Sequence, residues 1–397
     1  MLTSLGIIFI CGLLGAAVFQ RLRLPRIIGM LAAGIIVGPY ALNILSPEIL
    51  GISAELRKLA LIIILIRAGL SLDVRELRRV GRPALRMAFV PASLEILGYV
   101  LLAPVLLGIT RAEAAVMGAV MGAVSPAVVV PRMLRLMDEG YGAKHSVPQL
   151  IMAGASCDDV FVIVLFTSFM SMAQGESAGF GAILQAPVSI LLGAAVGAVC
   201  GLAAEELLKL LRRRGKTPGE NETVITALAL ALLLCAVESM LSGRVPFSGL
   251  LAVMGMACMT GQRAKESAQL LSERFGRLWS AAEILLFVLV GAAVDVRYTL
   301  AAGAMAVVMI FAALIFRAIG VLLCMAGTRL ERRERLFCAL AYLPKATVQA
   351  AIGAAPLAAG LSSGSMILSV AVLGIIITAP LGAICMDATY KKLLERE

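Results

Sequence analysis

The feature that most restricts the fold of this chain is the length of its apolar stretches. Hydrophobic residues make up 60% of the 397 residues, and they fall in stretches of about 18 to 25 rather than at amphipathic spacing. A helix of that length spans the hydrocarbon core of a bilayer. Only helices and closed barrels satisfy their backbone groups inside lipid, and these stretches lack the alternation of barrel strands. The sequence therefore predicts an all-α polytopic membrane protein.

Breaks in the hydropathy divide the chain into about thirteen transmembrane helices joined by short loops. The expected spans cover about 2–20, 26–45, 56–72, 84–108, 112–137, 147–173, 187–211, 221–242, 246–262, 277–295, 299–326, 334–358 and 364–388. No loop is long enough to hold a soluble module, so we expect one membrane domain.

The basic residues predict how the chain is oriented. With the N-terminus outside, the inner loops and the C-terminal tail carry 27 of the 35 Lys and Arg residues, whereas the outer loops carry five. Cytoplasmic loops of membrane proteins carry such an excess. We therefore expect a multi-pass protein of the plasma (inner) membrane with its N-terminus outside and its C-terminus cytoplasmic. The formal charge of +10 then suits anionic lipid and requires no nucleic acid partner.

An internal repeat links the third and tenth expected spans. "RAGLSLDVR" (67–75) and "LVGAAVDVR" (289–297) share Gly, Asp, Val and Arg at a constant offset of 222, which also pairs Glu95 with Arg317. Equivalent spans are seven apart, an odd number, so they cross the membrane in opposite directions, as in inverted-topology transporters. We expect a single membrane transporter domain over residues 1–397. It would divide into repeat one at about 1–173, a linking span at about 187–211 and repeat two at about 221–390.

Prolines interrupt corresponding spans of the two repeats. "AVSPAVVVP" (123–131) lies in the fifth span and "YLPKATVQA" (342–350) in the twelfth. Proline frees backbone groups, which membrane proteins tolerate only where these groups line protein or a water-filled cavity. Two broken helices in opposed orientation bring opposite dipole ends to one site. The sequence predicts two crossed, Pro-broken helices that hold a small ion.

Two adjacent aspartates, Asp158 and Asp159, lie near the middle of the sixth span. An ionisable residue at the centre of a membrane helix costs at least about 2.5–3.5 kcal/mol and indicates function by default. Two adjacent carboxylates repel each other where water is scarce, so one is expected to hold a proton near neutral pH. We therefore expect a site at which a metal cation and a proton compete for one carboxylate.

Other polar groups in the spans have candidate roles. Lys345 follows the proline of the twelfth span and either neutralises an aspartate, carries a second proton, or forms a bridge that only joins two helices. Ser125 offers a hydroxyl for cation coordination at the fifth-span break, or bonds the backbone freed by the neighbouring proline. Glu95 and Arg317 are expected to form a buried ion pair near the pseudo-twofold axis.

These residues resemble the monovalent cation:proton antiporter superfamily, in the paired-aspartate branch of NapA-type and NHA-type sodium/proton exchangers. The similarity extends from "GMLAAGIIVGP" (29–39) through "GASCDDV" to "TAPLGA" (378–383), and "SPAVVVP" and "LPKATVQAAIG" are most similar to the NHA-type branch. The resemblance implies thirteen or fourteen helices, a six-helix core domain that moves against a dimerisation domain, and a homodimer.

By this resemblance, Asp159 is the cation- and proton-binding aspartate, with Na+ or Li+ as the bound metal. Asp158 is its partner aspartate, and Lys345 is the lysine that pairs with the partner. The Glu95 and Arg317 pair is similar to one in the NHA-type branch. Many relatives have Thr-Asp where this chain has Val-Ser at 124–125, a departure that bears on cation selectivity.

The leading functional hypothesis is secondary active exchange of Na+ or Li+ for H+ by alternating access. The protein would then be a transporter involved in pH homeostasis, and not an enzyme. No Gly-rich phosphate loop with a trailing Lys-Ser/Thr occurs in the sequence, so we expect no nucleotide and no cofactor, with cation and proton as substrates. One alternative is a sodium-coupled symporter of an organic anion, although paired carboxylates repel an anion. Another is a cation channel or sensor, which would act without counter-movement of protons.

Overall fold

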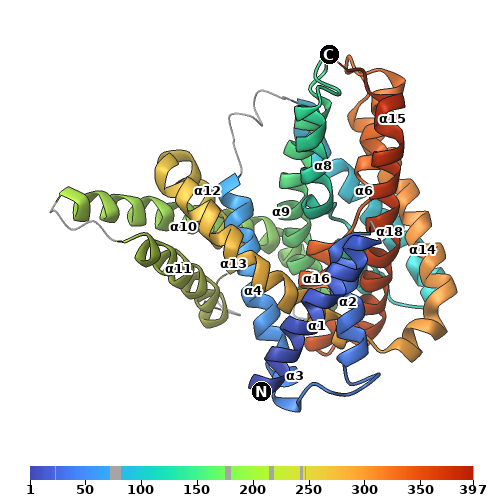
Figure 1. Ribbon diagram of the computed structural model, residues 1–397, viewed down its shortest axis with the longest axis horizontal. Coiled ribbons are helices and arrows are strands. Elements are labelled where there is room, and N and C mark those ends of the chain that lie inside the picture. The colour runs from blue at the N-terminus through green and yellow to red at the C-terminus, as the bar shows by residue number, and fades with distance from the viewer. Residues whose placement is uncertain are drawn as a thin grey trace. The chain divides into compact units, whose positions relative to one another are not determined.

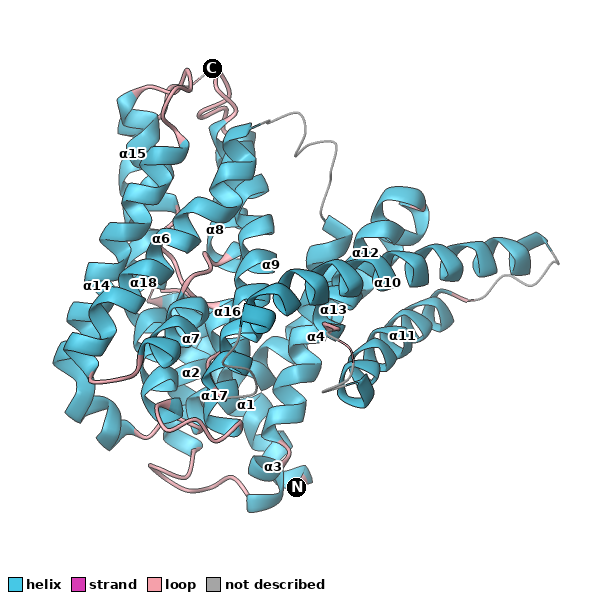
Figure 2. Cartoon of the chain, turned by 180° about the vertical axis from the view of Figure 1, so that it is seen from behind, coloured by secondary structure: helices cyan, strands magenta, loops and turns pink. Residues whose placement is uncertain are grey.

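The computed structural model describes residues 1–22, 24–71, 82–174, 180–213, 219–241, 245 and 247–396. These residues form helices and loops, and no strand occurs among them (Figure 2). The predicted all-α fold class is thus confirmed. Each of the thirteen expected spans overlaps one helix or consecutive shorter helices, but the helix of the second span ends at Val37 and not at 45. Within the described residues, eight segments are long and apolar enough to cross a membrane, so the number of crossings stays a prediction.

The helices form two compact units. Unit 1 comprises Met1–Arg57, Glu76–Glu176 and Ile284–Glu397, and unit 2 comprises Lys58–Arg75 and Ser177–Glu283. The helices of unit 1 (Figure 1) are α1 (Leu2–Arg21), α2 (Arg26–Val37), α3 (Pro47–Gly51), α6 (Arg82–Leu107), α7 (Arg111–Met121), α8 (Pro126–Asp138), α9 (Val147–Ala173), α14 (Val296–Cys324), α15 (Arg332–Ala341), α16 (Thr347–Ile352), α17 (Ala355–Ala358) and α18 (Gly364–Leu393). The helices of unit 2 are α10 (Phe180–Arg213), α11 (Glu220–Leu241) and α12 (Gly249–Arg263). Two further helices contribute residues to both units, α4 (Ser53–Ser71) and α13 (Lys265–Ala292).

Capping boxes fix where α7 and α15 begin. The Thr110 hydroxyl accepts a hydrogen bond from the Glu113 backbone N–H at 3.2 Å, and the Glu113 carboxylate accepts one from the Thr110 N–H at 3.0 Å. Glu331 and Glu334 form the same reciprocal arrangement at the start of α15. A capping box satisfies two backbone donors that a helix start otherwise leaves free. Both helices that lead into a proline interruption therefore have a defined first residue.

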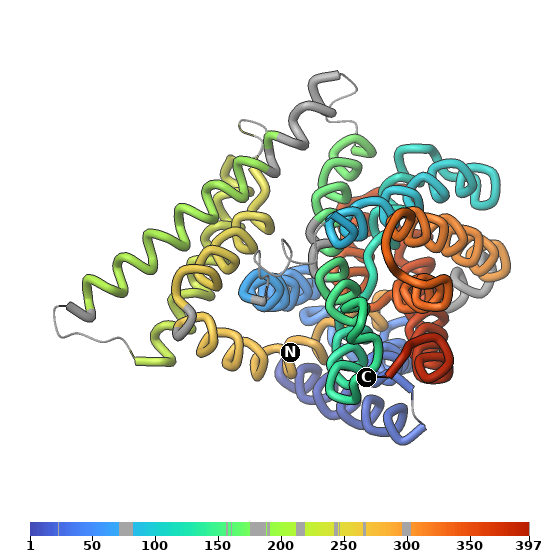
Figure 3. Tube along the Cα trace, turned by 90° about the horizontal axis from the view of Figure 1, so that it is seen from above, coloured from blue at the N-terminus to red at the C-terminus, as the bar shows by residue number. Residues whose placement is uncertain are grey.

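In unit 2, α10 and α12 pack against each other through glycines. Gly193, Gly197 and Gly201 recur every fourth residue along α10, and a Cβ on any of them would collide with a backbone carbonyl oxygen of α12 or of Ser248 at its start. Small residues at this spacing let two membrane helices approach with their backbones in contact. Figure 3 shows the two helices side by side. Replacing one of these glycines would push the helices apart.

Candidate functional site

Two helices of unit 1 are interrupted where the sequence predicted breaks. The first interruption separates α7, which ends at Met121, from α8, which begins at Pro126. The second separates α15, which ends at Ala341, from α16, which begins at Thr347. Proline is tolerated at the first position of a helix because it needs no N–H there. The residues between each pair of helices are unwound and leave their backbone groups free for other partners.

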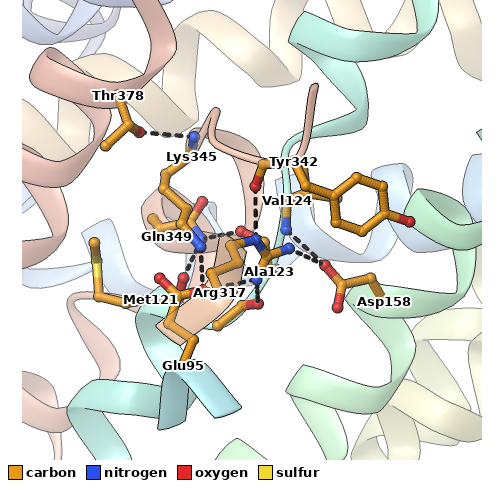
Figure 4. Close-up of polar contacts among 11 residues, drawn as sticks. Glu95, Met121, Ala123, Val124, Asp158, Arg317, Tyr342, Lys345, Gln349 and Thr378 are labelled. Carbon is orange, nitrogen blue, oxygen red and sulfur yellow. Dashed lines mark hydrogen bonds and ion pairs between the residues drawn. The ribbon is translucent and has the colours of Figure 1, made fainter. Parts of the chain in front are cut away.

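The two unwound segments are hydrogen-bonded to each other. The Ser125 backbone N–H donates to the Pro344 carbonyl oxygen at 2.8 Å. The buried Gln349 side chain donates to the Ala123 carbonyl oxygen at 2.9 Å, and more weakly to that of Met121 at 3.4 Å (Figure 4). The Pro-broken helices therefore meet, and each supplies a partner for the backbone that the other exposes.

Arg317, from α14, joins both breaks to two acidic side chains. Its Nε donates to the Tyr342 carbonyl oxygen at 2.6 Å, and its Nη1 donates to the Gly122 carbonyl oxygen. The same Nη1 lies 2.7 Å from Glu95 Oε2, and Nη2 lies 2.7 Å from Asp158 Oδ2 (Figure 4). A guanidinium suits this position because it presents five N–H donors in one plane. The expected contact between Glu95 and Arg317 is thus present, and it belongs to a larger cluster.

Lys345 has a different partner from the one that the sequence led us to expect. We expected its ammonium to pair with an aspartate, but Nζ lies 2.5 Å from Glu95 Oε2. The physical reason is that Arg317 neutralises Asp158 through Oδ2, while Glu95 Oε2 lies within reach of both Arg317 and Lys345. The Lys345 backbone N–H donates to the Thr378 hydroxyl at 2.9 Å, which fixes the lysine within its unwound segment. The aspartate–lysine pair is therefore replaced by a glutamate–lysine pair.

The paired aspartates lie near the middle of α9 in different environments. Asp158 is fully buried, and its Oδ2 accepts hydrogen bonds from the Val124 N–H at 2.8 Å and from Arg317. Asp159 is 8% exposed, and within the described residues no ion pair involves it. The buried oxygens without a hydrogen-bond partner among those residues include Asp158 Oδ1, Asp159 Oδ1 and Ser125 Oγ. Such oxygens are the ligands that hard cations prefer.

Sequence reasoning did not single out two residues that shape this site. Gln349 bonds the opposite break, and Thr378 holds the Lys345 backbone. A glutamine in an apolar span is a detectable signal, because a buried amide requires partners. Thr378 carries no such signal, since a threonine in a membrane helix usually bonds its own helix backbone.

The chain matches a family model described as "Sodium/hydrogen exchanger, transmembrane" over residues 5–391. It is 32% identical over 413 residues to sodium/hydrogen exchanger 9B2 of Homo sapiens, covering 98% of this chain and 74% of that protein. It is 34% identical over 403 residues to sodium/hydrogen exchanger 9B2 of Xenopus tropicalis, covering 96% and 73%. Sodium/hydrogen exchanger 9B1 of Homo sapiens is 31% identical over 419 residues, covering 100% and 78%.

A solved structure has a similar fold. The sodium proton antiporter MjNhaP1 from Methanocaldococcus jannaschii, at pH 8, superimposes with a TM-score of 0.83 at 20% sequence identity, covering 99% of this chain and 98% of that chain. The predicted relation to the cation:proton antiporter superfamily is confirmed by these matches. The chain therefore belongs to the sodium/hydrogen exchanger family, whose members are transporters and not enzymes.

Proposed function

We propose that this protein exchanges Na+ or Li+ for H+ across the membrane, and that cation and proton compete for Asp159. The supporting observation is the contrast between the two aspartates. Asp158 Oδ2 is held by Arg317 and by a backbone N–H, whereas Asp159 is a buried carboxylate with no ion pair among the described residues. The names of the relatives support sodium and proton as the ions.

The cation would bind to oxygens at the first break. Asp159 supplies the negative charge, and Asp158 Oδ1 and Ser125 Oγ supply further acceptors. Ser125 follows Val124, whose N–H bonds Asp158, so its hydroxyl belongs to the same part of the break. A proton on Asp159 removes the charge that attracts the cation. The two ions therefore exclude each other, and that exclusion couples their movements.

Alternating access converts this competition into transport. The loaded site opens to one side of the membrane at a time, so a cation is released on one side and a proton on the other. The gradient of either ion then drives the other, with no nucleotide and no cofactor. A role in pH homeostasis follows from proton exchange.

The charge distribution of the loops and the family resemblance support a proposed membrane orientation and a proposed homodimer. The excess of Lys and Arg in one set of loops supports a plasma (inner) membrane protein with its N-terminus outside and its C-terminus cytoplasmic, in contact with anionic lipid. A homodimer and an inverted-topology repeat are further parts of the proposal, supported by the family resemblance and by the offset of 222 that relates Glu95 to Arg317.

The test uses purified protein in liposomes with an acid interior and a pH-sensitive dye. Na+, Li+ and K+ are added in turn to the wild type and to Asp159→Asn. We expect Na+ or Li+ to dissipate the pH gradient in the wild type and to have no effect in the variant. Asp138→Asn is the matched control, because it makes the same change at an exposed position at the end of α8, and it should retain exchange.

Wild-type exchange in Asp159→Asn would overturn the assignment of the site. Cation current without proton movement would indicate a channel instead. A proton signal that requires an added organic anion would indicate a symporter.

A further inference from the structure

A pocket of about 390 Å³ lies within unit 2 and shares no residue with the ion site. Its walls come from α10, α11, α12 and the parts of α4 and α13 that belong to this unit. Most lining side chains are apolar, among them Leu207, Leu230 and Leu271. Small-molecule pockets in proteins typically have volumes of about 300–1,000 Å³ and apolar walls with a few fixed polar groups. The size and lining therefore suit a small hydrophobic molecule.

One carboxylate, Glu205 of α10, lies in this apolar wall. Its side chain is only 7% exposed, and its Oε2 is buried with no hydrogen-bond partner among the described residues. The next residue, Glu206, is 71% exposed and pairs with Lys209 at 2.8 Å. Two adjacent glutamates on one helix thus differ sharply: one faces water and a lysine, and the other faces the pocket. A buried carboxylate oxygen without a partner is suited to a cationic donor.

The hydroxyl groups of the pocket favour the same kind of ligand. Thr223 Oγ1 donates its proton to the Gly219 carbonyl oxygen, and Thr260 Oγ1 donates to that of Met256, both at 3.1 Å. These hydroxyls therefore offer only acceptor lone pairs to a ligand. No Lys or Arg occurs among the described lining residues. These two hydroxyls and the Glu205 carboxylate thus present acceptors to the pocket, which favours a cationic ligand over an anion.

We propose that the pocket binds a small hydrophobic amine in its ammonium form. The ammonium pairs with Glu205, and the hydrocarbon part packs against the leucines of α10, α11 and α13. A neutral hydrocarbon would fill the apolar part but would leave the carboxylate without a partner. This binding is separate from ion exchange and is measured without an ion gradient, so either proposal can fail without the other.

The test measures binding to the purified full chain by equilibrium dialysis, together with the shift in thermal unfolding temperature. The probes are phenylbutylamine, the neutral phenylbutanol and the anionic phenylbutyrate. We expect the wild type to bind the amine about tenfold more tightly than the alcohol, because a charge-assisted hydrogen bond contributes that much. Glu205→Gln should lose this preference, and Glu206→Gln, the matched control, should keep it.

A second variant tests the cavity itself. Ala227→Leu places a larger side chain in the lining while leaving the Glu205 carboxylate intact, so it should weaken amine binding even if Glu205→Gln fails to fold. The proposal is overturned if the wild type binds none of the probes or binds amine and alcohol equally. It is also overturned if phenylbutyrate binds most tightly, or if the preference for the amine survives in Glu205→Gln.

Discussion

Each charge in the buried cluster of unit 1 depends on a partner from another helix. Glu95 on α6 receives both Arg317 and Lys345, and Arg317 also reaches Asp158 on α9. Removing one member of a buried ion pair typically costs about 3–5 kcal/mol, because the remaining charge is left in a medium of low dielectric constant. The cluster is therefore a structural requirement of this unit as well as a neighbour of the proposed ion site.

Asp158→Asn tests this dependence. The substitution keeps the size of the side chain but removes the charge opposite the Arg317 Nη2, so we expect a loss of about 3 kcal/mol in the free energy of unfolding. The measurement is thermal or denaturant unfolding of the purified protein in detergent.

Asp387→Asn is the control for that substitution. Asp387 pairs with Arg132 and Arg135, but its side chain is 41% exposed, and exposed pairs contribute only about 0–1 kcal/mol. If both variants lost the same free energy of unfolding, the buried contact between Asp158 and Arg317 would stabilise the protein no more than the exposed pairs of Asp387.

The sequence predicted part of this cluster and missed the rest for a definable reason. The repeat offset identified Glu95 and Arg317 as counterparts, and the structure brings them to 2.7 Å. An aspartate partner for Lys345 was one of the sequence-based alternatives, and the family resemblance favoured it. Which carboxylate meets which cation depends on how α6, α9 and α14 are rotated about their axes, and no spacing along the chain contains that information.

At the level of helices, the prolines predicted where the two helices are interrupted, but only one of them predicted the first residue of the helix that follows. Pro126 is the first residue of α8, as its lack of an N–H requires. After the second break, α16 begins at Thr347 rather than at Pro344. The backbone of Ala346, directly before α16, has φ −160° and ψ −75°, which is not helical, so the helix starts after it. The Lys345 N–H in this unwound segment bonds the hydroxyl of Thr378 on α18, a tertiary contact that the local sequence could not reveal.

Gly197→Leu tests the close contact between α10 and α12. A side chain at this position collides with the Ala252 carbonyl oxygen, which belongs to a helix backbone and cannot move aside. Overpacking typically costs about 1–3 kcal/mol, so we expect a lower unfolding temperature in detergent.

Gly303→Leu in α14 is the control, because a Cβ there has no neighbour within 4 Å. It makes the same chemical change in another apolar helix and should leave the unfolding temperature nearly unchanged. If the two variants unfolded at the same temperature, the glycines of α10 would not be what holds the two helices close. The spacing of these glycines is visible in the sequence, but the helix that meets them is not.

For the whole molecule, composition and motifs predicted the all-helical membrane fold and the family. The family resemblance implies two domains, but the bounds of the two compact units were not predicted. Unit 2 joins residues 58–75 to the distant segment 177–283, whereas the expected division was into consecutive repeats. Packing between segments far apart in the chain creates such a unit, and hydropathy describes only neighbouring residues. The inverted repeat itself remains a prediction.

The buried ion-pair cluster also has an electrical consequence. When Glu95 and Asp158 are ionised and Arg317 and Lys345 are protonated, the two negative and two positive charges of the cluster cancel. In the proposed mechanism, Asp159 carries the charge that loading changes, and one proton or one Na+ neutralises it equally. A one-for-one exchange at this group moves no net charge and is electroneutral.

The membrane potential should therefore neither drive nor slow the exchange. Moving a single charge across the membrane at about 100 mV changes the free energy by about 2.3 kcal/mol. That amount would change the equilibrium ratio of ion concentrations more than tenfold. We expect the same exchange rate in liposomes clamped by K+ and valinomycin at zero and at about −100 mV. A rate that follows the potential would mean that Lys345 also gives up its proton during the cycle. If the cluster stays neutral through the cycle, the concentration ratios of the two ions alone set the direction of the proposed exchange.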